Sequence, residues 1–230
     1  MERALIVAAH PDDDILGCGG SIAKLCAKRH AVRVVFLAEG VSARYDIDQV
    51  QSPEVVAAIE HRNRCAVAAL GRLGVSSENV FLSERLCCRL DQQPLIDLVK
   101  SIEDHIKDFE PTICYTHAAF DVNVDHRTAH WAALAAARPV RNSALRAIVG
   151  FEIPSSTEWN TAAPFAPTIF EDISDHIDNK IAALREFDQE MHSPPHPRSE
   201  EVIRALAVVR GAQAGMRHAE GFSLIRATGV

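Results

Sequence analysis

The chain has 230 residues, an apolar content of 47% and a formal net charge of −7 at pH 7. This length supports one sizeable hydrophobic core, so we expect a single domain over residues 1–230. The acidic balance argues against nucleic acid and anionic membrane surfaces as default partners, because both attract basic proteins.

Neither a membrane span nor a signal peptide is expected. No stretch approaches the roughly 18 apolar residues of a membrane span, and aspartates at 12–14 interrupt any signal-peptide pattern. These features predict a cytoplasmic protein. Six cysteines, at positions 18, 26, 65, 87, 88 and 114, form no CxxC pair. Their spacing favours free, buried thiols over a cysteine zinc site.

Short apolar runs alternate along the chain with segments of helical periodicity. The predicted strands cover residues 5–9, 32–37, 80–82, 112–117, 146–152 and 167–173. The predicted helices cover residues 21–29, 53–73, 94–109, 127–138, 177–189 and 199–210. This alternation predicts an α/β fold with a mainly parallel sheet, right-handed crossovers and flanking helices.

Two polar loops follow predicted strands. "HPDDD" follows the first strand and "THAAFDVNVDHR" begins at the end of the fourth. Ligands of such sheets bind beyond the carboxyl ends of the strands, so we expect both loops to meet at one crevice. His10, Asp13 and His126 then supply the three ligands typical of catalytic zinc, and the cation offsets repulsion among the aspartates. Asp12 remains as a carboxylate able to act as general base.

Other interpretations of these residues stay open at this stage. Asp13 or Asp14 could cap a helix beginning near Gly17, and His126 could be a packed histidine at a helix start. Their joint occurrence at two adjacent strand ends favours the metal site.

"GCGGSI" together with Glu39 suggests a dinucleotide fingerprint, a second kind of site. Ile22 stands where its third glycine should be, however. Three aspartates would also repel a pyrophosphate, so the metal site is the better interpretation.

Several motifs carry a family resemblance. "AHPDDD" resembles the AHPDDE signature of the LmbE/PIG-L family of zinc-dependent N-acetylglucosaminyl deacetylases, and "NVDHR" resembles that family's second metal motif. Five further segments resemble bacterial members that act on sugars: "LAEGVSAR", "EIPSSTEW", "FEDIS", "PHPRS" and "AEGFSLIR". The resemblance thus covers nearly the whole chain.

The resemblance implies a Rossmann-like α/β fold and a zinc ion, or another divalent metal, on the residues that match His10, Asp13 and His126. It implies that Asp12 is the general base. The expected reaction removes an N-acetyl group from an amino sugar of the N-acetylglucosamine type. The expected partner is therefore an N-acetylated sugar or glycoconjugate, and a homo-oligomer is compatible with the family.

Four further residues are expected to act around this centre, two of them by the resemblance (Asp125 and Arg62) and two by their residue type and position (Arg44 and Trp159). Asp125 is expected to orient the neighbouring metal ligand. Arg62 matches a substrate-contacting arginine on the family's helix. Arg44 is expected to reach a phosphate or polar head group of the substrate. Trp159 is expected to stack on a sugar face, with a packing role as the alternative.

Three departures from the family pattern stand out. Asp14 replaces the usual glutamate and shortens a supporting carboxylate by one methylene. Asn123 stands where several members have a histidine that stabilises the oxyanion or protonates the product, and we assign it to the catalytic group. Cys87 or Cys88 stands where many members have an aspartate just before "RLD".

The proline-rich segment 191–199 offers a replacement for the missing histidine. We expect this loop to fold over the crevice, with His196 near the acetyl group and Arg198 on a substrate hydroxyl or anionic group. The alternative is that the prolines only end one helix and Ser199 caps the next.

Two other functions remain open on the sequence alone. One is a zinc hydrolase of the same fold that acts on a non-sugar amide or a thiol conjugate. The other is a non-catalytic sugar-binding relative, which has no use for a water-activating aspartate.

Overall fold

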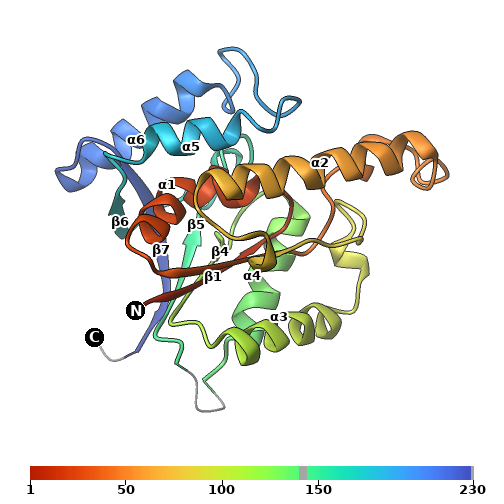
Figure 1. The fold of residues 1–230 in the computed structure, drawn as a ribbon, viewed down its shortest axis with the longest axis horizontal. Coiled ribbons are helices and arrows are strands. Elements are labelled where there is room, and N and C mark those ends of the chain that lie inside the picture. Colours follow the sequence, from red (N-terminus) through yellow and green to blue (C-terminus); the bar gives the residue numbers. More distant parts are fainter. Residues whose placement is uncertain (140–143, 229–230) are drawn as a thin grey trace.

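The computed structural model describes residues 1–139 and 144–228. Its centre is a seven-stranded sheet with the order β3-β2-β1-β4-β5-β7-β6 (Figure 1). The strands are β1 (Arg3–Ala8), β2 (Ala31–Phe36), β3 (Val80–Phe81), β4 (Ile113–His117), β5 (Ala147–Phe151), β6 (Ile169–Asp172) and β7 (Ala219–Ala227).

Strands β3, β2, β1, β4 and β5 pair in parallel, and this order is that of a Rossmann-like sheet. The strand order reverses between β1 and β4. Loops that leave the carboxyl ends of these two strands diverge there and open a crevice. The predicted parallel sheet is confirmed, and the crevice lies where the two polar loops begin.

The sheet is covered on both faces by helices. These are α1 (Asp13–Ala27), α2 (Pro53–Arg72), α3 (Leu95–Phe109), α4 (Val124–Ala136), α5 (Ile177–Leu184) and α6 (Glu200–Ala214). Helices α1, α2, α5 and α6 share one core cluster, whereas α3 and α4 share another. Figure 1 shows the first group above the sheet and the second group below it.

Strand β1 explains why its sequence is apolar without alternation. Ile6 faces the core beneath α1 and α2, and its neighbours Leu5 and Val7 face the core beneath α3 and α4. All three side chains are fully buried. A strand buried on both faces has no solvent side, so every position is apolar.

The start of α1 differs from the prediction. The helix begins at Asp13, eight residues before the expected start, and is kinked at Cys18. A Cβ on Gly17 would lie 2.4 Å from the ring of Phe151, and one on Gly20 would lie 2.7 Å from Ile173. The glycines therefore permit close helix packing and are not a phosphate-binding fingerprint.

The C-terminal region also corrects the prediction. Helix α5 ends at Leu184, not at residue 189, and α6 is followed by β7, a strand that the sequence pattern did not predict. Strand β7 pairs antiparallel with both β5 and β6, so the sheet is mixed. Over the described ranges, none of the helices combines the length and apolar character that crossing a membrane requires.

Within the described residues, four short 3-10 helices complete the fold: Ser42–Arg44, Ser77–Asn79, Leu90–Gln92 and Thr157–Trp159. The first, third and fourth lie in or beside loops that contribute residues to the crevice.

Candidate functional site

The loop after β1 carries an unusual backbone conformation at Asp12. Its φ is 121°, a region that residues other than glycine rarely adopt, at a cost of about 1–3 kcal/mol. Asp12 is the N-cap residue of α1, yet its side chain makes no capping hydrogen bond. The strained turn instead leaves this carboxylate free to contact residues of the crevice.

Asp13 lies at the centre of a compact group of potential metal ligands. Its Oδ2 lies 3.2 Å from His10 Nδ1 and 3.3 Å from His126 Nε2. The three ligand atoms all lie within 4.8 Å of one another, and all three residues are buried. Asp13 Oδ1 is buried with no hydrogen-bond partner among the described residues. This unpaired oxygen and the two imidazoles suit a divalent cation such as zinc.

Each histidine is oriented by a second carboxylate. His10 Nε2 lies 2.9 Å from Asp125 Oδ2, and His126 Nδ1 lies 3.1 Å from Asp121 Oδ2. A proton on each of these outer nitrogens leaves the inner nitrogen with a lone pair facing Asp13. This carboxylate–histidine arrangement is the one that metal-binding histidines adopt, so the predicted ligands fit a metal.

The two outer carboxylates are themselves fixed. Asp125 accepts hydrogen bonds from the backbone N–H groups of Cys88 (2.5 Å) and Leu90 (2.9 Å). Asp121 accepts from the hydroxyls of Ser156 and Thr157. Burial raises the pKa of Asp121, but its bonds to His126, Ser156 and Thr157 outweigh burial and lower the pKa to about 2. Asp121 therefore stays ionised beside His126.

The two histidines hold their protons strongly in the metal-free arrangement. Burial lowers the pKa of His10, but hydrogen bonds to Asp125 and Asp13 outweigh it and raise the pKa to about 10. The Asp13 charge and the bonds to Asp121 and Asp13 raise the pKa of His126 to about 9 in the same way. Metal binding, which needs neutral imidazoles, must therefore release protons.

Asp12 faces the opposite side of the crevice, between two arginines. Its Oδ2 lies 2.9 Å from Arg62 on α2 and 2.8 Å from Arg198 on the loop before α6. Glu190 accepts hydrogen bonds from Arg62, Arg44 and Arg198. Burial raises the pKa of Asp12, and the two arginines only partly oppose this rise.

These residues line a cavity of about 150 Å³, with His10 and His126 on one side and the arginines on the other. Asn123 also lines it, and its side chain accepts from the Asp125 N–H as the N-cap of α4. Asp14 lies behind Asp12 and accepts its N–H at 3.3 Å. Burial is the largest cause that raises the pKa of Asp14 to about 8, and repulsion by the Asp12 carboxylate adds to it.

Two predicted residues lie apart from the described lining of this cavity. His196 packs its ring against His192, with centroids 4.0 Å apart, and its Nδ1 accepts the Arg198 N–H. Trp159 is 66% exposed. Their predicted catalytic and sugar-stacking roles stay predictions.

Sequence reasoning missed Asp121, His117 and Glu190. His117 ends β4, stacks on His126 and accepts the Ala9 N–H at 2.8 Å, so it supports the ligand loop. Both Asp121 and His117 lie in the polar loop already recognised, which was the available signal. Glu190 lies directly after the helix predicted over residues 177–189, and no local pattern marked it.

Glu39 has no role of the kind that a dinucleotide site requires. Its carboxylate accepts from Ser42 and from the N–H groups of Val41 and Cys87, so it organises the loop after β2. The dinucleotide interpretation is therefore wrong both in its glycines and in its acidic residue.

Comparison with known proteins gives consistent matches. The family model described as GlcNAc-PI de-N-acetylase matches residues 5–137. YaiS of Escherichia coli (strain K12), described as an uncharacterized deacetylase, is 31% identical over 187 residues, which cover 79% of this chain and 88% of YaiS.

Two solved structures share the fold at low sequence identity. The N,N'-diacetylchitobiose deacetylase of Pyrococcus horikoshii, in complex with an inhibitor, aligns with a TM-score of 0.78 and 18% identity, over 98% of this chain and 84% of that one. GalB of Pseudomonas putida KT2440, a 4-carboxy-2-hydroxymuconate hydratase, aligns with a TM-score of 0.76 and 22% identity, over 100% and 98% of the two chains. The same fold thus occurs in proteins of different activity.

Proposed function

Because the chain belongs to the GlcNAc-PI de-N-acetylase (PIG-L) family of hydrolytic deacetylases, we propose that it removes the N-acetyl group of an amino sugar of the N-acetylglucosamine type. We infer that a zinc ion binds through His10, Asp13 and His126. A zinc ion in this position supplies Lewis acidity to water and to the amide carbonyl.

Asp12 acts as the base in this proposal. Its carboxylate lines the same cavity as His10 and His126. It takes a proton from the attacking water and returns it to the nitrogen of the departing amine, so acetate and a free amino sugar result. Burial favours this exchange because it raises the pKa of Asp12 toward the working pH.

The arginines position both the base and the substrate. Arg62 and Arg198 hold Asp12 Oδ2, which leaves the other carboxylate oxygen to meet the water. Arg44 and Arg198 line the cavity and can donate to hydroxyl or anionic groups of the sugar. Asp14 accepts a hydrogen bond from the Asp12 N–H, and Asp125 orients the His10 ring through Nε2.

We propose residues of the neighbouring segments as the donor to the oxyanion and as the group that stacks on the sugar. We assign the donor role to His196, whose neighbour Arg198 already reaches Asp12, with Asn123 as the polar group on the cavity wall. Trp159, an exposed residue at the end of the Thr157–Trp159 3-10 helix, is the proposed stacking residue for a sugar ring.

One observation carries the proposal. Asp13, with its unpaired buried oxygen, lies beside two imidazoles that Asp121 and Asp125 orient. These imidazoles line a cavity that is also lined by Asp12, a carboxylate outside the ligand group. A binding protein needs no such base, so this arrangement supports hydrolysis. The sugar class is supported by the matching family model, which is described as GlcNAc-PI de-N-acetylase.

An acetate-release assay tests the proposal. The zinc-loaded protein should release acetate from N-acetylglucosamine, its oligomers or its glycosides, and Asp12→Asn should not. Release only from acylated thiol conjugates or other non-sugar amides would overturn the sugar assignment. Release from no amide at all would overturn the deacetylase mechanism.

The cytoplasmic location and a homo-oligomeric state remain our predictions from the sequence. Cell fractionation and the molecular mass in solution test them.

A further inference from the structure

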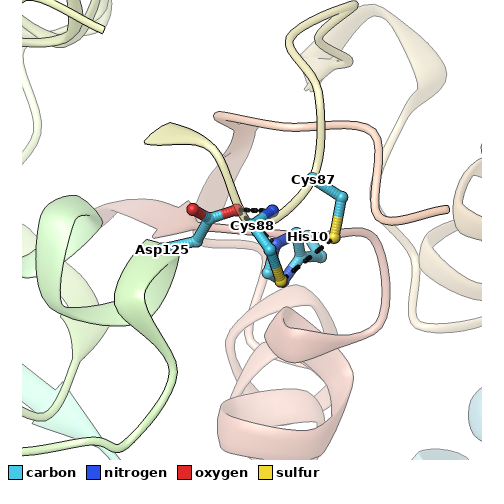
Figure 2. A group of neighbouring side chains, drawn as sticks. All are labelled: His10, Cys87, Cys88 and Asp125. Atoms are coloured by element: carbon cyan, nitrogen blue, oxygen red, sulfur yellow. Dashed lines mark hydrogen bonds and ion pairs between the residues drawn. The ribbon is translucent and has the colours of Figure 1, made fainter. Parts of the chain in front are cut away.

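A second group of potential metal ligands lies behind His10, on the side away from Asp13. It comprises Cys87, Cys88, Asp125 and His10, whose ligand atoms all lie within 4.8 Å of one another. Figure 2 shows both sulfurs gathered with the His10 ring and the Asp125 carboxylate. Neither thiol takes part in the proposed deacetylation.

The distance between the two sulfurs is that of a metal-binding pair. Cys87 Sγ lies 3.8 Å from Cys88 Sγ. Two thiolates that each lie about 2.3 Å from one zinc ion, at a tetrahedral angle, are about 3.8 Å apart. Adjacent side chains on an extended strand point in opposite directions, so the two neighbouring sulfurs can come this close only where the backbone is not extended.

The backbone of this turn is held in the required conformation. Cys88 has a φ of 56°, in the left-handed region that residues other than glycine rarely occupy. The Cys87 N–H donates to Glu39 at 2.8 Å and the Cys88 N–H donates to Asp125 at 2.5 Å. The thiols are therefore brought together before any ion binds, which lowers the ordering cost of binding.

Access and charge also suit a cation. Cys88 is exposed while Cys87 is buried, so an ion can enter from one side and become partly enclosed. Asp125 adds a carboxylate oxygen, a harder ligand that zinc and cadmium both accept.

We propose that Cys87, Cys88 and Asp125 form a binding site for a thiophilic divalent cation such as zinc or cadmium, with His10 Nε2 at the fourth position. Binding replaces the two thiol protons and the Nε2 proton of His10, and all three pass to solvent. The ion also competes with His10 for Asp125 Oδ2, so this site and the site formed by His10, Asp13 and His126 oppose each other.

The test is a titration of the reduced, zinc-loaded protein with Cd²⁺, followed by the ultraviolet charge-transfer absorbance of cadmium thiolates. The His10–Asp13–His126 site contains no sulfur and cannot produce this signal. We expect the absorbance to saturate at one Cd²⁺ per chain, and His126→Ala should retain it.

The matched variants are Cys88→Ser and Cys26→Ser. Loss of a residue that only supports a ligand weakens metal binding by about 10-fold or more. Cys88→Ser removes a ligand itself, so it should weaken Cd²⁺ binding by more than about 10-fold. Cys26 is a partly buried thiol outside the cluster, and its variant should titrate like the wild type. Equal titration of Cys88→Ser and the wild type would overturn the site, as would a signal that depends on Cys26. Should Cys88→Ser fail to fold, Cys87→Ala provides the same comparison.

Discussion

Asp12 combines a strained backbone with a buried charge, two features that a structural residue rarely has. Its φ of 121° turns the side chain toward Arg62 and Arg198, away from the capping position that an aspartate at a helix start usually takes. The two guanidinium groups hold the carboxylate in place on the side of the cavity that they line. This arrangement separates Asp12 from Asp13, although the two are adjacent in the sequence.

The first prediction follows from that separation. Asp12→Asn keeps the shape and removes the base, so turnover should fall by about 10²–10⁴-fold while zinc content stays at one ion per chain. Steady-state kinetics and elemental analysis of the same sample measure both. A metal-free variant would show that Asp12 is a ligand and that the roles of the two aspartates are misassigned.

A second prediction concerns Asp121, which orients His126 through Nδ1. Asp121→Asn should lower zinc affinity by about 10–100-fold, because the imidazole loses both its fixed orientation and the charge that raises its basicity. Competition with a chromophoric chelator measures the affinity. Asp172→Asn, at an exposed carboxylate on β6, is the control and should bind zinc like the wild type. Unchanged affinity in Asp121→Asn would contradict the role.

A buried ion pair between Glu220 of β7 and Lys180 of α5 lies against the backbone of helix α1. Glu220 accepts from the Gly20 and Ser21 N–H groups and lies 2.7 Å from Lys180 of α5. Lys180 also donates to the Leu16 carbonyl oxygen at 2.8 Å, beside the kink in α1. One carboxylate thus satisfies the backbone where α1 bends and ties α1, α5 and β7 together.

The third prediction tests this junction. Glu220→Gln leaves the buried Lys180 ammonium without a counter-charge, so the free energy of unfolding should fall by about 3–5 kcal/mol. Denaturant unfolding measures the loss. Lys24→Met, which removes a more exposed ion pair with Glu171, should cost less than about 1 kcal/mol. If both variants lost the same free energy of unfolding, the buried ion pair would contribute no more to stability than the more exposed one.

The segment between α5 and α6 is anchored by Glu190. Burial raises the pKa of Glu190, but Arg62, Arg44 and Arg198 outweigh burial and lower the pKa below the usual 4.5. A carboxylate with a lowered folded pKa stabilises the protein fully above its unfolded pKa. That stabilisation is lost as the pH falls through the folded pKa.

Glu190→Gln should therefore lose stability near neutral pH and show a flatter decline between about pH 5 and pH 3. Thermal unfolding across this range provides the measurement. Glu103→Gln, at an exposed carboxylate of α3, is the control and should decline in parallel with the wild type. If Glu190→Gln also declines in parallel, the arginine contacts do not couple this group to folding.

Elements with a clear period were predictable, and those shaped by tertiary contacts were not. Helices α2 and α3 match their predicted spans because proline and apolar periodicity mark them in the sequence. The first two turns of α1 were missed because aspartates and glycines disfavour helix. Packing on Phe151 and the Glu220 contacts hold those turns in place instead. Strand β7 was missed because it is buried at one end and exposed at the other, which removes the alternating pattern.

In the whole molecule, the topology explains why the meeting of the candidate ligand residues was predictable. Parallel strands β1 and β4 are neighbours, so the loops after them meet, and each loop carries its ligands in a short motif. No such rule predicts the contacts between Asp12, Glu190 and the arginines that line the other side of the cavity. Asp12 and Arg198 are 186 positions apart, and Arg62 and Glu190 are 128 apart. These pairs depend on how α2 and the α5–α6 segment pack, which no local pattern encodes.

We expect His10, Asp13 and His126 to hold one zinc ion beside Asp12. Anomalous diffraction at the zinc edge, from crystals of protein loaded with one equivalent of zinc, locates that ion. One strong peak should lie among His10 Nδ1, Asp13 and His126 Nε2, and no peak should lie there in His126→Ala. A wild-type peak found only elsewhere, or a peak at this position that persists at full occupancy in His126→Ala, would show that these three residues do not hold the zinc.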